Sequence, residues 1–128
     1  MKKILFAIMF LLSACSQNNS DTFKVGSYKM LNSMHNVPVM LSFAEDGSLN
    51  AKVVNIIMGQ YELNGNNLII IPSGTTMMMG PKKDMETEQN FIQSLLMVKS
   101  YKMQENNLVL EMENGSSMIF EPHNKPNE

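Results

Sequence analysis

Apolar and polar residues alternate along most of the chain beyond residue 24, in short runs separated by turn residues. A period of two is typical of antiparallel strands that turn one face to a core and the other to solvent. The pattern predicts about nine strands, near residues 25–31, 38–43, 48–55, 59–64, 67–72, 74–79, 98–103, 107–112 and 116–121. The turns contain Asn, Asp and Gly, which tolerate positive φ, so we expect consecutive strands to form hairpins.

One segment, residues 84–98, follows a different period. Its apolar residues recur at helical spacing: Phe91, Ile92, Leu95, Leu96 and Val98. Asp84 is the expected N-cap, and Glu86 and Glu88 are placed in the first turn, where acidic groups favour the helix dipole. The sequence therefore predicts an α+β, mostly β fold: a curled antiparallel sheet or open barrel with one helix packed against it.

A partial repeat relates residues 61–70 to residues 101–110. Each copy begins with Tyr and reaches Asn-Asn-Leu after the same interval. Two copies are too few for a solenoid. The repeat predicts two hairpins of the same shape, each with a tyrosine and a following apolar residue on one face of the sheet.

The first residues have the features of a bacterial lipoprotein signal. Lys2 and Lys3 precede an apolar run, residues 4–12, that is too short to span a bilayer, and Leu12-Ser13-Ala14-Cys15 matches a lipobox. We expect cleavage after Ala14 and lipidation of Cys15, the only cysteine of the chain. The alternative is a plain secretory signal followed by a chance cysteine.

This interpretation divides the chain into four parts. Residues 1–14 are the signal peptide, 15–24 the lipidated cysteine and a polar tether, 25–121 a folded domain, and 122–128 a disordered tail. Two or three acyl chains on Cys15 would make membrane attachment effectively permanent. Ser16 rather than aspartate follows the cysteine, which by the sorting rule of enteric bacteria favours the outer membrane, with the domain facing the periplasm.

Charge and composition limit the partners of the domain. Removal of Lys2 and Lys3 with the signal moves the formal net charge from −2 to about −4, and the chain contains no arginine. Nucleic-acid binding needs a basic surface and phosphate recognition favours arginine, so we expect neither. The expected partners are the membrane, through the acyl chains on Cys15, and an envelope protein whose identity the sequence does not give.

Three consecutive methionines, Met77, Met78 and Met79, stand in the predicted strand 74–79. Neighbouring side chains on a strand point to opposite faces, so three sulfurs converge on one ion only if the segment is a loop, and we interpret the triplet as packing residues. The alternative is a periplasmic Cu(I) or Ag(I) site, because thioether sulfur is a soft ligand, with Met34 and His35 as further ligands. A third hypothesis, a small-ligand carrier, requires an apolar cavity inside the sheet.

No group of residues predicts catalysis. His35 is in a predicted loop, His123 is in the tail, and neither belongs to a Ser/His/Asp arrangement. Glu86 and Glu88 are two residues apart and point to different sides of a helix. Glu88 is expected to reach over the sheet and accept hydrogen bonds from Thr76 or from backbone amides. We therefore expect a protein that is not an enzyme and holds no cofactor.

An ordered set of residues matches the pattern of a known family: Phe43, Asp46, Gly47, Asn55, Gly59, Tyr61, Thr76, Met78, Pro81, Glu88 and Leu95. With them, residues 25–120 resemble the META domain, the module of HslJ-like heat-inducible envelope proteins of bacteria. Val54 and Gly80 stand where relatives often carry cysteines, which fits a pair that faces each other in those relatives, and Met77 replaces a common arginine. The resemblance implies a non-catalytic interaction or stability module with a role in the envelope stress response.

Overall fold

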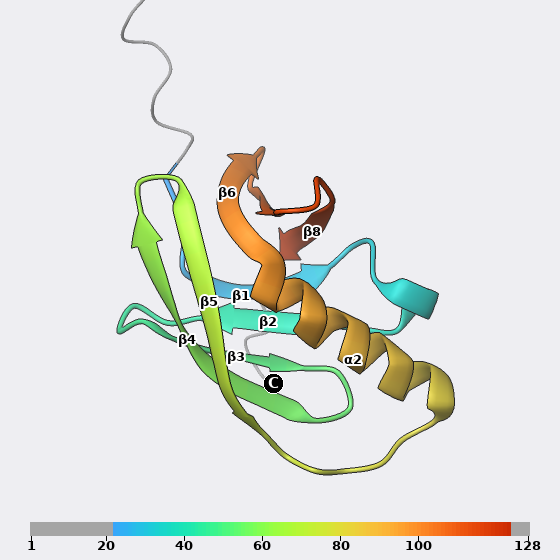
Figure 1. Cartoon of the computed structure of the whole chain (residues 1–128). Coiled ribbons are helices and arrows are strands. Elements are labelled where there is room, and N and C mark those ends of the chain that lie inside the picture. Colours follow the sequence, from blue (N-terminus) through green and yellow to red (C-terminus); the bar gives the residue numbers. More distant parts are fainter. Residues whose placement is uncertain (1–21, 124–128) are drawn as a thin grey trace, which may run out of the picture.

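The computed structural model describes residues 22–123, in which eight antiparallel strands form a closed barrel accompanied by an α-helix (Figure 1). Each strand pairs with the next, and β1 pairs with β8 to close the sheet. In chain order the elements are β1 (Gly26–Met30), η3 (Met34–Asn36), β2 (Met40–Phe43), β3 (Ser48–Lys52), β4 (Ile56–Asn64), β5 (Asn67–Thr75), α2 (Lys82–Met97), β6 (Val98–Gln104), β7 (Asn107–Met112) and β8 (Ser117–Pro122).

The mostly β fold with one packed helix is confirmed, and the sheet closes into a barrel. The predicted strand over residues 74–79 is wrong, because β5 ends at Thr75 and residues 76–80 leave the sheet. The partner strand β4 begins at Ile56, and the Thr76 amide donates to the Ile56 carbonyl oxygen. Beyond that bond β4 offers no further strand edge, so the methionine triplet lies in a loop.

The helix α2 begins two residues before the predicted start at residue 84. Asp84 as the N-cap is wrong: Pro81 holds that position, without a side-chain hydrogen bond, and Asp84 is the acidic residue of the first turn. Glu86 and Glu88 therefore come after the first turn. Lysine is a good helix former, so Lys82 and Lys83 extend the helix back to the proline.

The helix α2 lies over the barrel beside β5, which has little pairing with its neighbour β6 (Figure 1). The register between β5 and β6 has a single pair, Asn67 with Ser100, and α2 packs against β5 and η3. The helix buries Thr87, Glu88, Phe91 and Leu95. Leu96, expected on the apolar face, is instead 61% exposed. The helix therefore covers the part of the barrel that strand pairing leaves weakest.

The interior of the barrel is filled by side chains from every strand. At one end Phe23 joins an aromatic group, with ring centroids 5.1 Å from Phe43, 5.7 Å from Tyr61 and 5.1 Å from Tyr101. Phe23 was assigned to the tether by sequence, but its ring packs against the core. The packed structure therefore begins before residue 25.

The partial repeat corresponds to two hairpins with the same register. Tyr61 pairs with Ile70 across β4 and β5, and Tyr101 pairs with Leu110 across β6 and β7. Both tyrosines are buried. The two hairpins and their matching tyrosine positions are confirmed, but the turns differ: Gly65 alone has positive φ in the first turn, whereas Glu105 and Asn106 both have positive φ in the second.

The predicted signal peptide, Cys15 and most of the predicted tether lie outside the described residues, as do residues 124–128 of the predicted tail. At the other end, Pro122 belongs to β8, and the backbone amide of His123 donates to the Ser27 carbonyl oxygen at 2.8 Å. The folded part therefore extends two residues into the predicted tail. Within residues 22–123 no helix has the length and apolarity needed to cross a bilayer.

Candidate functional site

Asn55 and Glu88 are buried polar residues, each 3% exposed, that bring three segments of the chain together. Glu88 extends from the buried side of α2, and Asn55 lies between β3 and β4. Glu88 Oε1 accepts the backbone amides of Val54 at 3.0 Å and Asn55 at 2.7 Å, and Oε2 accepts the Asn55 side-chain amide at 2.8 Å. The expected bonding of Glu88 to backbone amides is present, and it fixes the helix to the β3–β4 connection.

The side chain of Asn55 continues the network into the loop after β5. Its Oδ1 accepts the Thr76 hydroxyl at 2.9 Å and the Met78 amide at 2.5 Å, and its Nδ2 also donates to the Met78 carbonyl oxygen at 3.2 Å. Thr76 in turn accepts the Ile56 amide at 3.0 Å. Thr76 is therefore a partner of Asn55 and not of Glu88. The backbone amide and the backbone carbonyl oxygen of Met78 are both bonded to the Asn55 side chain.

This arrangement has the chemistry of a structural anchor. Burying a carboxylate is costly unless its oxygens accept hydrogen bonds, and the bonds it then accepts are charge-assisted and strong. Both oxygens of Glu88 already accept bonds from within the protein. The carboxylate is therefore committed to holding the helix and the loop in place.

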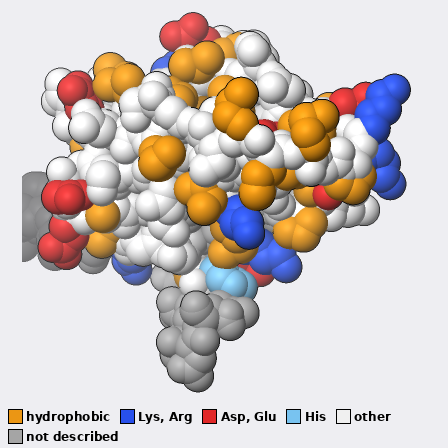
Figure 2. All heavy atoms as spheres, turned by 90° about the horizontal axis from the view of Figure 1, so that it is seen from below, with side chains coloured by type: hydrophobic (Ala, Val, Ile, Leu, Met, Phe, Trp, Pro, Cys, Tyr) orange, Lys and Arg blue, Asp and Glu red, His pale blue; other side chains and the backbone are white. Residues whose placement is uncertain are grey.

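A pocket of about 230 Å³ opens beside this network, between the loop after β5 and the first turns of α2. Four of its lining residues are methionines, Met77, Met78, Met79 and Met85. Met77 and Met79 are 88% and 86% exposed, and Met78 is 51% exposed. The prediction that alternation along a strand separates the three side chains is therefore wrong, because the triplet lies outside the sheet. Figure 2 views the molecule from below, the side on which Figure 1 shows this loop, and hydrophobic side chains are spread over much of that face.

Sequence reasoning missed Met85, although a signal for it was present. Met85, Glu88, Gln89 and Ile92 follow the spacing i, i+3, i+4, i+7, which places them on one face of a helix. All four line the pocket. The helical face that carries Glu88 therefore also places a fourth methionine at the pocket lined by the triplet.

Asp46 and Gly47, two of the family-pattern residues, form the turn between β2 and β3. The Asp46 carboxylate accepts the Ser48 hydroxyl at 2.7 Å and the Ser48 amide at 3.0 Å, and these hydrogen bonds, the hydroxyl first, lower the pKa of Asp46. Gly47 has φ +93°, which favours glycine. The Tyr61 hydroxyl donates to the Ala44 carbonyl oxygen at 2.5 Å beside this turn. The turn is thereby tied to the neighbouring strand β4.

The other family-pattern residues have packing roles. Phe43 and Leu95 belong to the core, and Pro81 precedes α2. A Cβ atom at Gly59 would lie 2.5 Å from the Ile71 carbonyl oxygen, so glycine alone fits where β4 shifts register against β5.

Val54 and Gly80 face each other across the network. A Cβ atom added at Gly80 would lie 3.8 Å from the Val54 Cβ and 3.2 Å from each Val54 γ carbon. A Cβ separation of about 3.8 Å is the mean for disulfides. The two positions that the family resemblance associates with cysteines are therefore neighbours in the fold.

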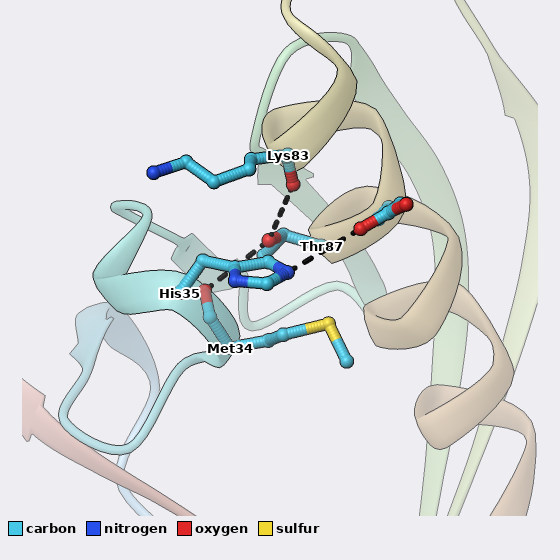
Figure 3. A network of polar contacts seen from close by, with 5 residues as sticks. Met34, His35, Lys83 and Thr87 are labelled. Atoms are coloured by element: carbon cyan, nitrogen blue, oxygen red, sulfur yellow. Dashed lines mark hydrogen bonds and ion pairs between the residues drawn. The ribbon is translucent and has the colours of Figure 1, made fainter.

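Met34 and His35 lie away from the methionine pocket, in η3, which contacts α2 (Figure 3). His35 Nε2 is 3.4 Å from Glu86 Oε1, and the Thr87 hydroxyl is 2.8 Å from the Lys83 carbonyl oxygen and 3.2 Å from the Met34 carbonyl oxygen. Neither Met34 nor His35 lines the methionine pocket. Among residues 22–123, no three His, Cys, Asp or Glu side chains are grouped to hold a metal ion.

The fold and the network define a small antiparallel barrel module with one helix anchored by a buried Asn–Glu pair. A model of the META domain matches residues 19–125, most of the chain, and the protein belongs to the META domain family. A search of curated proteins gives no match.

Solved structures agree with this fold. A DUF4847 family protein from Bacteroides vulgatus is similar with TM-score 0.63 and 17% identity, over 82% of this chain and 96% of that one. A protein from Burkholderia xenovorans is similar with TM-score 0.67 and 14% identity, over 85% and 93%. At such identities the likeness concerns the fold alone.

The first prediction concerns the anchor. Glu88→Gln keeps the shape but presents an amide donor where the carboxylate accepts, so one hydrogen bond becomes a clash of two donors. The free energy of unfolding is expected to fall by about 2 kcal/mol, measured by urea denaturation. The control Glu86→Gln, on the exposed side of the same helix, is expected to change it by less than about 0.5 kcal/mol. Equal effects of the two substitutions would refute the anchoring role.

The second prediction concerns the neighbouring positions 54 and 80. The double variant Val54→Cys/Gly80→Cys is expected to form a disulfide under oxidising conditions, visible as a 2 Da mass loss in protein kept unreduced. Closing this loop is expected to add about 3 kcal/mol to the free energy of unfolding relative to the same variant after reduction. The two single variants are the controls for pairing with Cys15, and free thiols in the oxidised double variant would contradict the geometry.

Proposed function

We propose that the protein is a lipoprotein of the bacterial cell envelope, anchored through acyl chains on Cys15, whose META domain is a non-catalytic binding module. The lipobox Leu12-Ser13-Ala14-Cys15 supports the anchor. Residues 16–22 are polar and reach roughly 25 Å when extended. Because Phe23 already packs against the core, this short stretch links the anchor to the domain and holds it close to the membrane.

The use of Glu88 supports a binding role over a catalytic one. A general acid or base needs a group that can exchange a proton with a substrate. Glu88 is the buried carboxylate beside the pocket, and both of its oxygens accept hydrogen bonds that hold the fold together. A reaction that changed its protonation would disrupt the attachment of α2.

The observation that carries the binding role is the apolar outer face of the β4–β5 hairpin. Ile56, Met58, Ile69 and Ile71 are 43%, 44%, 54% and 44% exposed. In the register of the hairpin, Ile71 lies beside Gln60 and Ile69 beside Glu62, so apolar and polar groups share this face. Exposed apolar surface beside polar groups is typical of protein–protein or membrane contacts. The partner that fits is an envelope protein with an apolar surface near the membrane.

A role in the envelope stress response and a position on the outer membrane, facing the periplasm, complete the proposal. The first rests on the likeness to HslJ-like proteins, the second on Ser16 after the lipidated cysteine. Both describe where and when a tethered binding module would act.

The third prediction tests the anchor. The full-length protein is expected to incorporate alkyne-tagged palmitate in cells and to fractionate with membranes, because acylation requires the Cys15 thiol. Cys15→Ser is expected to lose both label and membrane association, and the control Ser16→Ala to keep them.

In a strain that lacks the gene, only anchored protein is expected to restore survival after heat shock. An unlabelled wild-type protein would reject the lipoprotein assignment, and equal rescue by Cys15→Ser would reject the need for the anchor.

The fourth prediction tests the binding face. A photo-crosslinking amino acid at Ile71, on the outer face of β5, is expected to give a discrete adduct with one envelope protein in intact cells. The control places it at Lys102, an exposed position of β6, and is expected to give no such adduct. The same adduct from both positions, or none from Ile71, would contradict the assigned face.

A further inference from the structure

We propose that the methionine pocket binds a soft monovalent metal ion, Cu(I) or Ag(I), through the thioether sulfurs of Met77, Met78, Met79 and Met85. This goes beyond the binding role of the β4–β5 face, because it assigns a different site and a different ligand. The site lies between the loop after β5 and the beginning of α2.

The loop conformation is the first reason. On a strand, Met78 would point away from its two neighbours, and the sulfurs would not share an ion. The triplet instead lies outside the sheet, and its three methionines line the same pocket as Met85. Two elements separated by Gly80 and Pro81 therefore place four methionines around one pocket of about 230 Å³.

The second reason is that the backbone of the loop is held while its side chains are free to adapt. Asn55 accepts the Met78 amide and donates to the Met78 carbonyl oxygen, and Thr76 is held by the same side chain. The methionine side chains are unbranched and rotate about three bonds. Since Met77 and Met79 are almost fully exposed, their sulfurs can turn toward an ion without breaking core contacts.

The third reason is charge. Glu88 lines the pocket and is 3% exposed, yet no Lys or His among residues 22–123 lies within ion-pair distance of it. Buried charges are usually paired or placed beside a metal ion. A cation in the pocket would interact with this carboxylate through a poorly screened medium. Because the Glu88 oxygens already accept hydrogen bonds, the metal ligands are the sulfurs. The carboxylate attracts the cation electrostatically without binding it directly.

Ligand chemistry selects the ion. Thioether sulfur is soft and favours Cu(I), whereas Mg²⁺, Ca²⁺ and Mn²⁺ favour oxygen ligands. No cluster of His, Cys, Asp or Glu that suits a harder ion occurs in the part of the chain that the structure describes. The four thioethers beside a single negative charge therefore match a soft ion of charge +1.

The fifth prediction follows the sulfurs directly. The full-length protein, labelled with [methyl-¹³C]methionine and purified in detergent, is titrated with Ag(I) as an air-stable analogue of Cu(I). One equivalent is expected to shift the methyl signals of Met77, Met78, Met79 and Met85. The reason is that a bound ion withdraws electron density from the sulfur and so changes the chemical shift of the attached methyl group. The signals of Met34 and of the buried Met118 are expected to stay in place. Competition with a chromophoric chelator then measures Cu(I) affinity.

Matched variants make the result decisive. Met77→Leu/Met79→Leu replaces two exposed side chains, so folding is expected to be unchanged while stoichiometric binding is lost. Met85→Leu is expected to weaken binding, and the control Met34→Leu, an exposed methionine of η3, to leave it unchanged. Absence of shifts in the wild-type protein, shifts spread over all methionines, or full binding by Met77→Leu/Met79→Leu would each overturn the site.

Discussion

The structure depends on the hydrogen bonds between Glu88 and Asn55. A carboxylate on the helix and an amide between two strands are both removed from water, and each is stable there only because the other supplies part of its bonding. The backbone amides of Val54 and Asn55 complete the set. These hydrogen bonds, together with the buried Phe91 and Leu95, hold the helix over the place where β5 and β6 have a single register pair.

The same contact determines the path of the loop after β5. Once Asn55 is oriented by Glu88, its remaining amide positions bind Thr76 and both sides of the Met78 peptide. The loop is thereby held away from the sheet, and its methionines line a pocket shared with α2. Gly80 completes this path by lying against Val54, where a larger residue would be crowded. The path of the loop that carries the three methionines is therefore a consequence of the buried pair.

The fold is shared with proteins of very different sequence, whereas the candidate sites depend on residues of this chain. The likeness to a Bacteroides vulgatus and a Burkholderia xenovorans protein covers 82% and 85% of this chain at 17% and 14% identity. Closure of a small barrel needs alternation, turns and one covering helix, which many sequences supply. The anchor, the outer face of β4–β5 and the methionine pocket belong to the residues of this chain, and the proposed activities rest on them.

Sequence alone was enough for the class of fold and for the two hairpins of the repeat, because alternation, turn residues and helical spacing are local patterns. The family followed from the resemblance of an ordered set of residues to the META domain. The sequence also placed Glu88 where it would accept backbone amides, since helical spacing gives the face of a side chain. Only the tertiary structure decided that the sheet closes, that Phe23 packs against the core, and that residues 76–80 form a loop. Each of these outcomes depends on which strand edge or surface lies nearby in space. Methionine packs in strands, in cores and in exposed loops alike, so its presence in the sequence does not predict which of these it occupies.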